Sequence, residues 1–487
     1  MPEKNIIEKL RNDALSIYRG AVEKMIPHRA IWENLKIEGD LILFGKKGTP
    51  TCIEINYKKL RKIFIFGIGK AGYVMAGSAL DSLKEIKEMI AGGLVITKDG
   101  HAGEKDLHPL IVKEASHPVP DERSLESTGE IIDILRNAGE DDLVLFLISG
   151  GGSALYESLY PGMTIDDLKM ITNTLLKCGA DIEEINTIRK HISMVKGGKT
   201  AELAYPARVV SLILSDVLGS PLESIASGPT VADTGTFEDV MKIIEKYKIK
   251  DEIPQLIYDF ILRGVSGDIL ETIKAGNPCL AKSSSVVIGD NIAMTRQAKI
   301  IAEKLGYNTM ILTNWIRGEA RHIGDFFTSI ARHVESGDDF PVSAPCCVIA
   351  SGEPVVTIRG KGKGGRCQEA AISFTASSGE LSRSLFLAAG SDGTDGPTDA
   401  AGGIGSNLAL LFRPPHDLGR GWSPDQPGNG MKSELRSPSC RNEQKDLDIH
   451  EYLDNNNSYE YLKLTGDLII TGPTGTNVND LFVLMVG

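Results

Sequence analysis

The stretch Leu143–Leu155, LVLFLISGGGSAL, decides the fold that we predict for this chain. Its first part, Leu143–Ile148, is apolar without interruption, which predicts a strand buried on both faces and therefore a parallel sheet covered by helices. The three glycines that follow allow a sharp turn and bring backbone N–H groups close to a ligand. If a helix comes next, its N-terminus and those N–H groups suit an anion such as phosphate. A tight turn without a ligand explains this one motif equally well.

The same succession of strand, glycines and a charged or hydroxyl side chain occurs upstream of this stretch. A strand at Ile63–Phe66 leads into Gly67–Gly72, GIGKAG, which has the spacing of a dinucleotide-binding turn. The distal acid of that motif has a candidate in Asp99. Lys70 lies inside the turn, where a lysine can meet a phosphate or a developing negative charge. The turn is therefore open to two interpretations, a dinucleotide site and a catalytic lysine.

Polar side chains near the central strand form a second group of candidates. Arg189 and Lys196 share one face of a predicted helix and concentrate positive charge in an acidic chain, which favours an anion site. Asp216 follows the predicted strand Val209–Leu214. An aspartate at the carboxyl end of a parallel strand can hold magnesium or receive a hydroxyl proton, or it can simply cap the next turn. We interpret His117, in a proline-rich loop, as a satisfied loop residue.

The C-terminal half contains three further glycine-rich turns. Arg359–Glu369, RGKGKGGRCQE, predicts a mobile basic loop that opens a helix. Gly390–Ala401 and Thr471–Asp480 each follow a predicted strand and are rich in acids or hydroxyls. Asp392 and Asp395 do not match the calcium-loop pattern. Turns of this kind fit a magnesium nucleotide or a polyol.

Length and composition limit the classes of protein that remain. A chain of 487 residues is too long for one ordinary core, so we expect two domains, 1–278 and 279–487. The first helix, Lys4–Met25, is expected to pack on the first domain. The net charge of −12 argues against nucleic acid as a partner, and no apolar run is long enough to cross a membrane. Seven cysteines without a C-x-x-C pair and without a signal peptide indicate reduced thiols and a cytoplasmic location.

One segment, 403–445, differs from its surroundings. It contains five prolines and has no clear hydrophobic period. Two hypotheses explain it: an inserted disordered loop, or a local reading-frame slip that is restored near Leu447.

Taken together and in order, the motifs resemble those of the MOFRL-type glycerate 2-kinases. The motifs are FGIGKAG, SHPVPD, SGGGSAL, NTIRKHISMVKGG, SDVLGSPLESIASGPT, GKGGRCQE, GSDGTDGPTDAAG, NNNSY and TGPTGTNVNDL. The resemblance implies an α/β fold, with a Rossmann-like N-terminal domain, a smaller α/β C-terminal domain and an active site in the cleft between them. It also implies phosphorylation of D-glycerate by ATP to 2-phosphoglycerate, with magnesium or another divalent cation. The family's functional lysine and arginine correspond to Lys70 and Arg366, and Cys367 stands where the family usually has asparagine.

These observations combine into one hypothesis, a kinase in which Lys70 and Arg366 are catalytic. The expected metal ligands are Asp216, Asp392 and Asp395. The residues expected to bind substrate or phosphate are Gly67, Gly69, Ser149, Gly150, Gly151, Gly152, Ser153, Arg189, Lys196, Thr471, Thr474 and Asn477. Two alternatives stay open, an NAD(P)-dependent hydroxypyruvate reductase built on the Gly67–Gly72 turn and a sugar-phosphate binding module. A homo-oligomer is also left open.

Overall fold

A computed structural model describes residues 2–337, 339–407 and 448–487. It divides into two compact units: Met25–Asp290, called here the N-terminal unit, and Met1–Lys24 together with Asn291–Gly487, called the C-terminal unit. The division falls at Asp290, and not at the expected 278, because strand β9 (Ser283–Gly289) pairs with β8 (Arg208–Leu214) in the sheet of the N-terminal unit.

The N-terminal unit is built on a six-stranded sheet with the order β6-β5-β4-β7-β8-β9, in which every neighbouring pair is parallel. This is the strand order of Rossmann sheets, and it reverses between β4 and β7. All seven residues of β7 are buried, as the uninterrupted apolar run predicts. The remaining strands of this sheet are β4 (Lys62–Ile68), β5 (Ile90–Lys98), β6 (Leu110–Ala115) and β7 (Asp142–Ile148).

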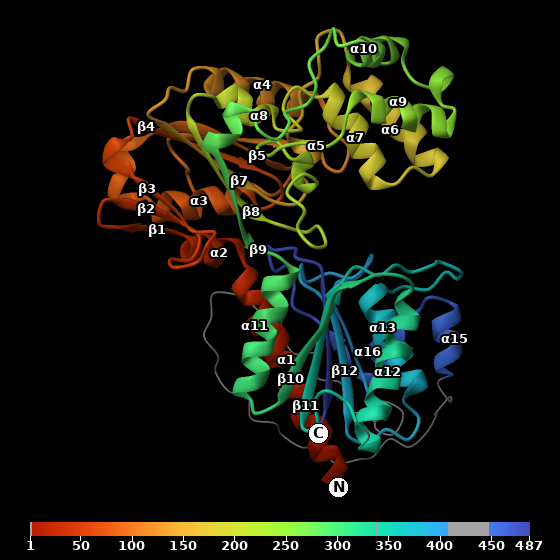
Figure 1. Cartoon of the computed structure of the whole chain (residues 1–487). Helices are drawn as coiled ribbons and strands as arrows, with labels where there is room; N and C mark the ends of the chain where they lie inside the picture. The colour runs from red at the N-terminus through yellow and green to blue at the C-terminus, as the bar shows by residue number, and fades with distance from the viewer. Residues whose placement is uncertain (1, 338, 408–447) are drawn as a thin grey trace. The chain divides into compact units, whose positions relative to one another are not determined.

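Helices cover both faces of this sheet. Figure 1 shows α3 (Gly72–Ser82) on one face and α4 (Glu122–Arg136) with α8 (Lys199–Ala204) on the other. Four further helices form a cluster with a core of its own. They are α6 (Ile165–Cys178), α7 (Ile182–Ile192), α9 (Phe237–Tyr247) and α10 (Gln255–Val265). The unit is completed by α2 (Pro27–Asn34), the short α5 (Gly152–Leu155) and a small antiparallel sheet of β1 (Leu35–Glu38), β2 (Leu41–Phe44) and β3 (Ile53–Asn56).

The C-terminal unit contains a mixed sheet with the order β10-β11-β15-β12-β13-β14, in which only β10 and β11 are parallel. Helices α12, α13 and α16 pack together on one side of it in Figure 1. The strands are β10 (Asn308–Ile316), β11 (Cys346–Gly352), β12 (Ser384–Gly390), β13 (Gly402–Gly405), β14 (Leu468–Ile469) and β15 (Asp480–Val486). The helices are α11 (Asn291–Lys304), α12 (Ala320–Ser336), α13 (Arg366–Ser378), α15 (Ile449–Asp454) and α16 (Ser458–Thr465).

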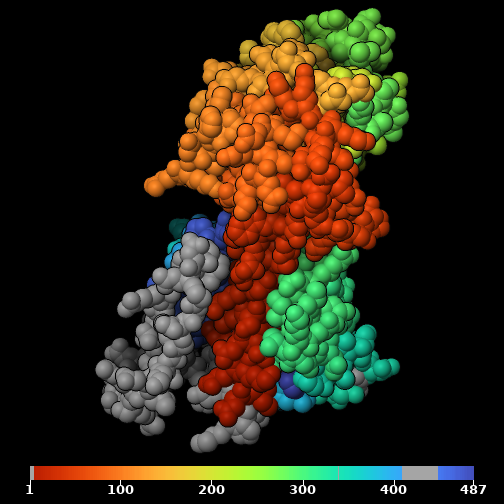
Figure 2. Space-filling view, turned by 90° about the vertical axis from the view of Figure 1, so that its left-hand side faces the viewer, coloured from red at the N-terminus to blue at the C-terminus, as the bar shows by residue number. Residues whose placement is uncertain are grey.

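The first helix, α1 (Pro2–Met25), belongs to the C-terminal unit, which differs from the expected packing on the first domain. A Cβ at Gly20 would lie 2.6 Å from Cδ1 of Ile301, so α1 and α11 approach closely, and Figure 2 shows them side by side on the surface. The Tyr18 hydroxyl donates a hydrogen bond to the Gly390 carbonyl at 2.7 Å. An amphipathic pattern predicts that a helix buries one face, but it does not identify the partner.

The atypical segment 403–445 enters the structure only at its start. Gly403–Gly405 belong to β13, whereas residues 408–445 lie outside the described residues. Within the part of the chain that the structure describes, no helix is both long enough and apolar enough to span a bilayer.

Candidate functional site

The turns after β4 and β7 meet where the order of the parallel sheet reverses, which is where such sheets bind ligands. The Lys70 amide donates to the Gly150 carbonyl at 2.9 Å, and the Ala71 amide donates to Ser149 Oγ at 3.0 Å. Gly69 has a φ of 110°, and a Cβ there would overlap the Ser149 carbonyl. Gly69 therefore serves the close approach of the two turns.

Several of the residues expected to bind a ligand instead hold these turns together. Ser149 is buried, and besides accepting from Ala71 its hydroxyl donates to the Ile68 carbonyl at 3.3 Å. A Cβ at Gly67 would lie 2.8 Å from the Gly72 carbonyl oxygen, and one at Gly152 would lie 2.9 Å from Cβ of Ala226. These residues make the turn possible but offer little to a ligand.

Three hydrogen-bond donors of the two turns are left without a partner in the described chain, and we call them the open donors. The N–H groups of Gly150 and Gly151 and the ammonium group of Lys70 have no hydrogen-bond partner among the residues that the structure describes. Cγ of Lys70 lies 3.4 Å from the position that a Cβ on Gly151 would take. Helix α5 is only four residues long, so the expected contribution of its dipole is small. An anion bound here would meet backbone amides and one lysine.

Asp216 and His117 lie against the same turn. A Cβ at Gly150 would overlap the Asp216 carboxylate, and a Cβ at Gly151 would lie 3.0 Å from Nε2 of His117. Burial and the neighbouring Lys70 charge lower the pKa of His117 to about 4. Sequence reasoning placed His117 in an inert loop. Its position directly after β6, at the carboxyl edge of the sheet, was the signal that could have identified it.

The two predicted basic residues have different environments. Lys196 is fully buried, and its ammonium donates to Glu157 Oε2 at 2.7 Å and to the Tyr156 carbonyl at 2.9 Å. Burial lowers the pKa of Lys196 to about 8. This lysine neutralises Glu157 and is not accessible to an anion. Arg189 donates to the Ser153 carbonyl at 2.9 Å, while its buried Nε has no hydrogen-bond partner within the described chain.

The hydroxyl of Ser153 is also engaged, because it lies 2.8 Å from Ser227 Oγ. Of the candidates in the N-terminal unit, the structure therefore leaves Lys70, Gly150, Gly151 and Arg189 with unused donors. It gathers the first three around one turn, with Asp216 beside it.

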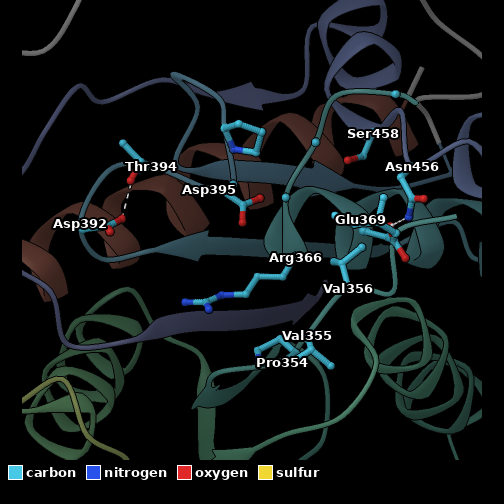
Figure 3. A pocket seen from close by; sticks show the side chains of 16 residues that line it. Pro354, Val355, Val356, Arg366, Glu369, Asp392, Thr394, Asp395, Asn456 and Ser458 are labelled. Carbon is cyan, nitrogen blue, oxygen red and sulfur yellow. Dashed lines mark hydrogen bonds between the residues drawn. The ribbon is translucent and has the colours of Figure 1, made fainter. Parts of the chain in front are cut away.

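The C-terminal unit contains a cavity of 570 Å³ that includes Arg366, Asp392 and Asp395 in its lining (Figure 3). The Arg366 side chain runs beneath Asp395 toward the Asp392 side of the view. Its Nε and Nη2 donate to the two carboxylate oxygens of Asp480 at 2.6 and 3.0 Å, and Nη1 donates to Glu353 at 3.0 Å. Burial raises the pKa of Asp480 to about 6. Arg366 is thus held rigidly, with most of its donors in use.

The two aspartates of this cavity bond to backbone amides. Asp395 accepts from the amides of Cys367 and Gln368, at 3.1 and 2.8 Å, and so caps the N-terminus of α13. Burial raises its pKa to about 7. Asp392 accepts from the Thr394 amide at 3.0 Å. Among the described residues, no three His, Cys, Asp or Glu side chains are grouped so that they could hold a metal ion.

The basic loop Arg359–Arg366 is braced, whereas the sequence predicted it to be mobile. Asn456 Oδ1 accepts from the amides of Arg359 and Gly360 at 2.7 and 3.0 Å. The side chains of Asn455 and Asn457 accept from Lys361 and Lys363, and the Asn455 carbonyl accepts from Gly362. The segment Asn455–Asn457 therefore takes up the amides that a phosphate would need.

The predicted hydroxyl and amide ligands of the last turn support a neighbouring loop. Thr474 donates from its hydroxyl to the Ser391 carbonyl at 2.6 Å and from its amide to the Asp392 carbonyl at 3.1 Å. Thr471 donates to the Gly472 carbonyl, and Asn477 accepts from the Asn479 amide. These residues shape the turn that carries Asp392.

Comparison with known proteins covers nearly the whole chain. A family described as a domain of unknown function (DUF4147) matches residues 13–262, and the MOFRL family matches 346–411 and 435–480. A glycerate 2-kinase from Pyrococcus horikoshii is 38% identical over 98% of this chain and 97% of its own. A D-glycerate 2-kinase from Thermotoga maritima is 38% identical over 98% of this chain and 99% of its own. A putative hydroxypyruvate reductase from Agrobacterium vitis is 36% identical over 87% of this chain and 99% of its own.

Among solved structures, the crystal structure of a glycerate kinase from Thermotoga maritima matches with a TM-score of 0.80 and 36% identity. The match covers 99% of this chain and 100% of the other. The residues around the two turns of the N-terminal unit and around the cavity of the C-terminal unit lie within the matched regions.

Proposed function

Because the chain belongs to the glycerate kinase family and carries a DUF4147 part followed by a MOFRL part, we propose that it transfers the γ-phosphoryl group of ATP to the 2-hydroxyl of D-glycerate. Phosphoryl transfer depends on positioning and on stabilising negative charge, with little covalent chemistry for the protein to perform. The observation that carries the proposal is the group of open donors at the sheet reversal, formed by Lys70, Gly150 and Gly151.

Each open donor has a role in this proposal. The Lys70 ammonium has no competing partner among the described side chains, so its charge is available to the transferred phosphoryl group. The amides of Gly150 and Gly151 are donors for a carboxylate or a phosphate, whereas the unbonded Nε of Arg189 is buried. Arg366 is the second catalytic cation, and its three ionic hydrogen bonds fix the direction of its guanidinium group.

A divalent cation such as Mg²⁺ is expected with ATP, and the residues present fit a site that the nucleotide completes. Magnesium is usually bound through one or two carboxylates together with substrate phosphates and water. Asp216, beside Gly150 in the N-terminal unit, is one candidate carboxylate, and Asp392, in the cavity of the C-terminal unit, is another. Both oxygens of Asp395 already accept backbone amides, which makes it the weakest of the three expected ligands. When bound, the ion neutralises charge on the β- and γ-phosphates.

The main alternative is a hydroxypyruvate reductase, supported by the GIGKAG turn after β4 and by the relative from Agrobacterium vitis that is named a putative hydroxypyruvate reductase. In a dinucleotide site the distal acid binds the ribose. Here Asp99 has both carboxylate oxygens engaged by Arg123, at 2.7 and 2.8 Å. A ribose would have to displace this bidentate pair, which favours the kinase.

The described cysteines are all free, which supports a cytoplasmic location.

Two parallel assays of the purified full-length protein test the proposal. One contains D-glycerate, ATP and Mg²⁺, and the release of ADP is measured. The other contains hydroxypyruvate and NADH, and the loss of NADH absorbance is measured. We expect ADP release that depends on D-glycerate, with no NADH oxidation. NADH oxidation without ADP release would replace the kinase by the reductase, and neither reaction would favour a binding module.

A further inference from the structure

We propose that His117 takes the proton from the 2-hydroxyl of D-glycerate as that oxygen attacks the γ-phosphorus, a role that rests on the proposed function. A hydroxyl must lose its proton when it becomes a phosphate ester. Transfer of that proton to a positioned side chain contributes typically about 10²–10⁴-fold to a rate. Nothing in the comparisons assigns a residue to this step.

The place of His117 in the fold carries the proposal. His117 stands two residues after the end of β6, so it lies at the carboxyl edge of the sheet that also holds the turns of β4 and β7. The Cδ2–Nε2 edge of its ring faces Gly151, because a Cβ there would lie 2.9 and 3.0 Å from these two atoms. The Lys70 side chain covers the same glycine. One small area therefore holds a cation, an open amide and an imidazole.

Both ring nitrogens of His117 are available to a ligand or to a proton. Neither ring nitrogen of His117 bonds to any residue that the structure describes, although the side chain is about half-buried. A ring with neither nitrogen bonded to the protein is open to a ligand or to water. His101, another histidine beside the Lys70 turn, differs in this respect. Its Nδ1 lies 3.1 Å from the Lys70 carbonyl oxygen, and its side chain is exposed.

The charges that face the ring keep it neutral in the free protein. These groups are Lys70 from the turn after β4, Lys98 from the end of β5 and His101 from the following loop, and all lower its pKa together with burial. The pKa of about 4 leaves a lone pair free at neutral pH. The carboxylate of glycerate and the phosphates of ATP bring negative charge to the ring. This raises the proton affinity of the ring toward the range that suits a general base.

The step balances without a further reactant. The O–H bond of the 2-hydroxyl breaks and its proton passes to Nε2 of His117. The oxygen's electron pair forms the new bond to the γ-phosphorus. The bond between the γ-phosphorus and the β–γ bridging oxygen breaks, and its electron pair leaves on ADP. The protonated His117 then returns its proton to water when the products leave.

The test uses H117Q, with H322Q as the control, because His322 is exposed on α12 and is not among the groups that face His117. We expect kcat of H117Q to fall by about 100-fold or more, with little change in KM for D-glycerate. H322Q should keep a kcat close to that of the wild type. In H117A, added imidazole should restore part of kcat, which a loss of structure would not allow.

Two results would overturn the proposal. One is an H117Q protein whose kcat stays close to that of the wild type. The other is an H117A protein that melts at the wild-type temperature and loses activity, yet does not respond to imidazole, because a folded site that an added base does not rescue shows that His117 acts otherwise than by accepting the proton. A failure of the proposed function is distinguishable, since the wild type itself would then release no ADP from D-glycerate.

Discussion

Two glycine-rich segments of this chain look alike in sequence and differ in structure: Ser149–Ser153 in the N-terminal unit and Arg359–Arg366 in the C-terminal unit. In the first, the amides of Gly150 and Gly151 have no partner among the described residues. In the second, five successive amides are taken by Asn455–Asn457, which lie 93 to 97 residues further along the chain. Glycines and cations indicate an anion loop only when the amides are left unused, and distant residues decide that.

The cations of these two regions differ in the same way, because one has no ionic partner among the described side chains and the other has two. Lys70 has no ionic partner among the described side chains, whereas Arg366 bonds to both oxygens of Asp480 and to Glu353. A guanidinium held by two carboxylates keeps its direction but offers less net charge to a ligand. We therefore propose that Lys70 and the N-terminal turn stabilise the larger part of the developing charge, that the braced residues Arg359–Lys363 shape a rigid wall, and that Arg366 acts as a second cation with a fixed direction.

Lys196 gives the largest expected effect, and it acts on stability. K196M should lower the free energy of unfolding by about 3–5 kcal/mol, because the buried Glu157 loses its hydrogen-bonded counter-charge and keeps only Arg189, at 3.8 Å. Urea denaturation of wild type and variant measures this. The double variant K196M/E157Q should recover most of the loss. A large fall in activity with an unchanged unfolding curve would instead make Lys196 a ligand and weaken the comparison.

Removing the brace of the C-terminal loop comes next. N456A loses the acceptor for two amides and the donor to Glu369, so we expect a loss of about 2–3 kcal/mol in unfolding free energy. The released loop should also be cut faster by trypsin at Lys361 and Lys363. N137A is the matched control, since the exposed Asn137 side chain donates one hydrogen bond to Asp133. Equal trypsin rates for both variants would mean that Asn456 does not brace the loop.

The smallest expected effect, taken per unit of pH, is a pH dependence that comes from Asp395. Burial raises its pKa to about 7, above the value of about 3.9 in the unfolded chain. The folded protein thus holds this proton more tightly, so its stabilising contribution is complete below about pH 4 and is lost as the pH rises through about 7. Between these values the unfolding free energy should fall by at most about 1.4 kcal/mol per pH unit. Denaturant unfolding at several pH values should show a flatter profile for D395N, and parallel profiles would contradict the assignment.

Local patterns were sufficient to predict much of the fold. The apolar run of β7 is buried along its whole length, and the parallel sheet and the α/β class are confirmed. The position of the turn after β7 could be predicted for two reasons. A strand buried on both faces is easy to recognise in a sequence, and the carboxyl ends of parallel strands meet at one edge of the sheet. Membership of the glycerate kinase family, which the ordered motifs indicated, is confirmed as well.

What sequence reasoning missed depends on partners that are far apart along the chain. The ion pair of Lys196 with Glu157, the brace of Asn456 on the basic loop and the packing of α1 on α11 all join distant segments. A basic residue on a helical face looks the same whether it meets solvent or a buried carboxylate. His117 was missed because its environment is formed by the turns after two other strands.

The central claim is that Lys70, beside the open amides of the N-terminal turn, stabilises the transferred phosphoryl group. The measurement that tests it most directly is kcat of K70A with D-glycerate and ATP, monitored by phosphorus NMR, with K58A as the lysine control, since Lys58 is exposed and pairs with Asp40. We predict a loss of about 100-fold, or roughly 3 kcal/mol, for K70A and near wild-type turnover for K58A. The wild-type product should show phosphorus coupled to a single methine proton. A K70A protein that forms this product at the wild-type rate would contradict the claim.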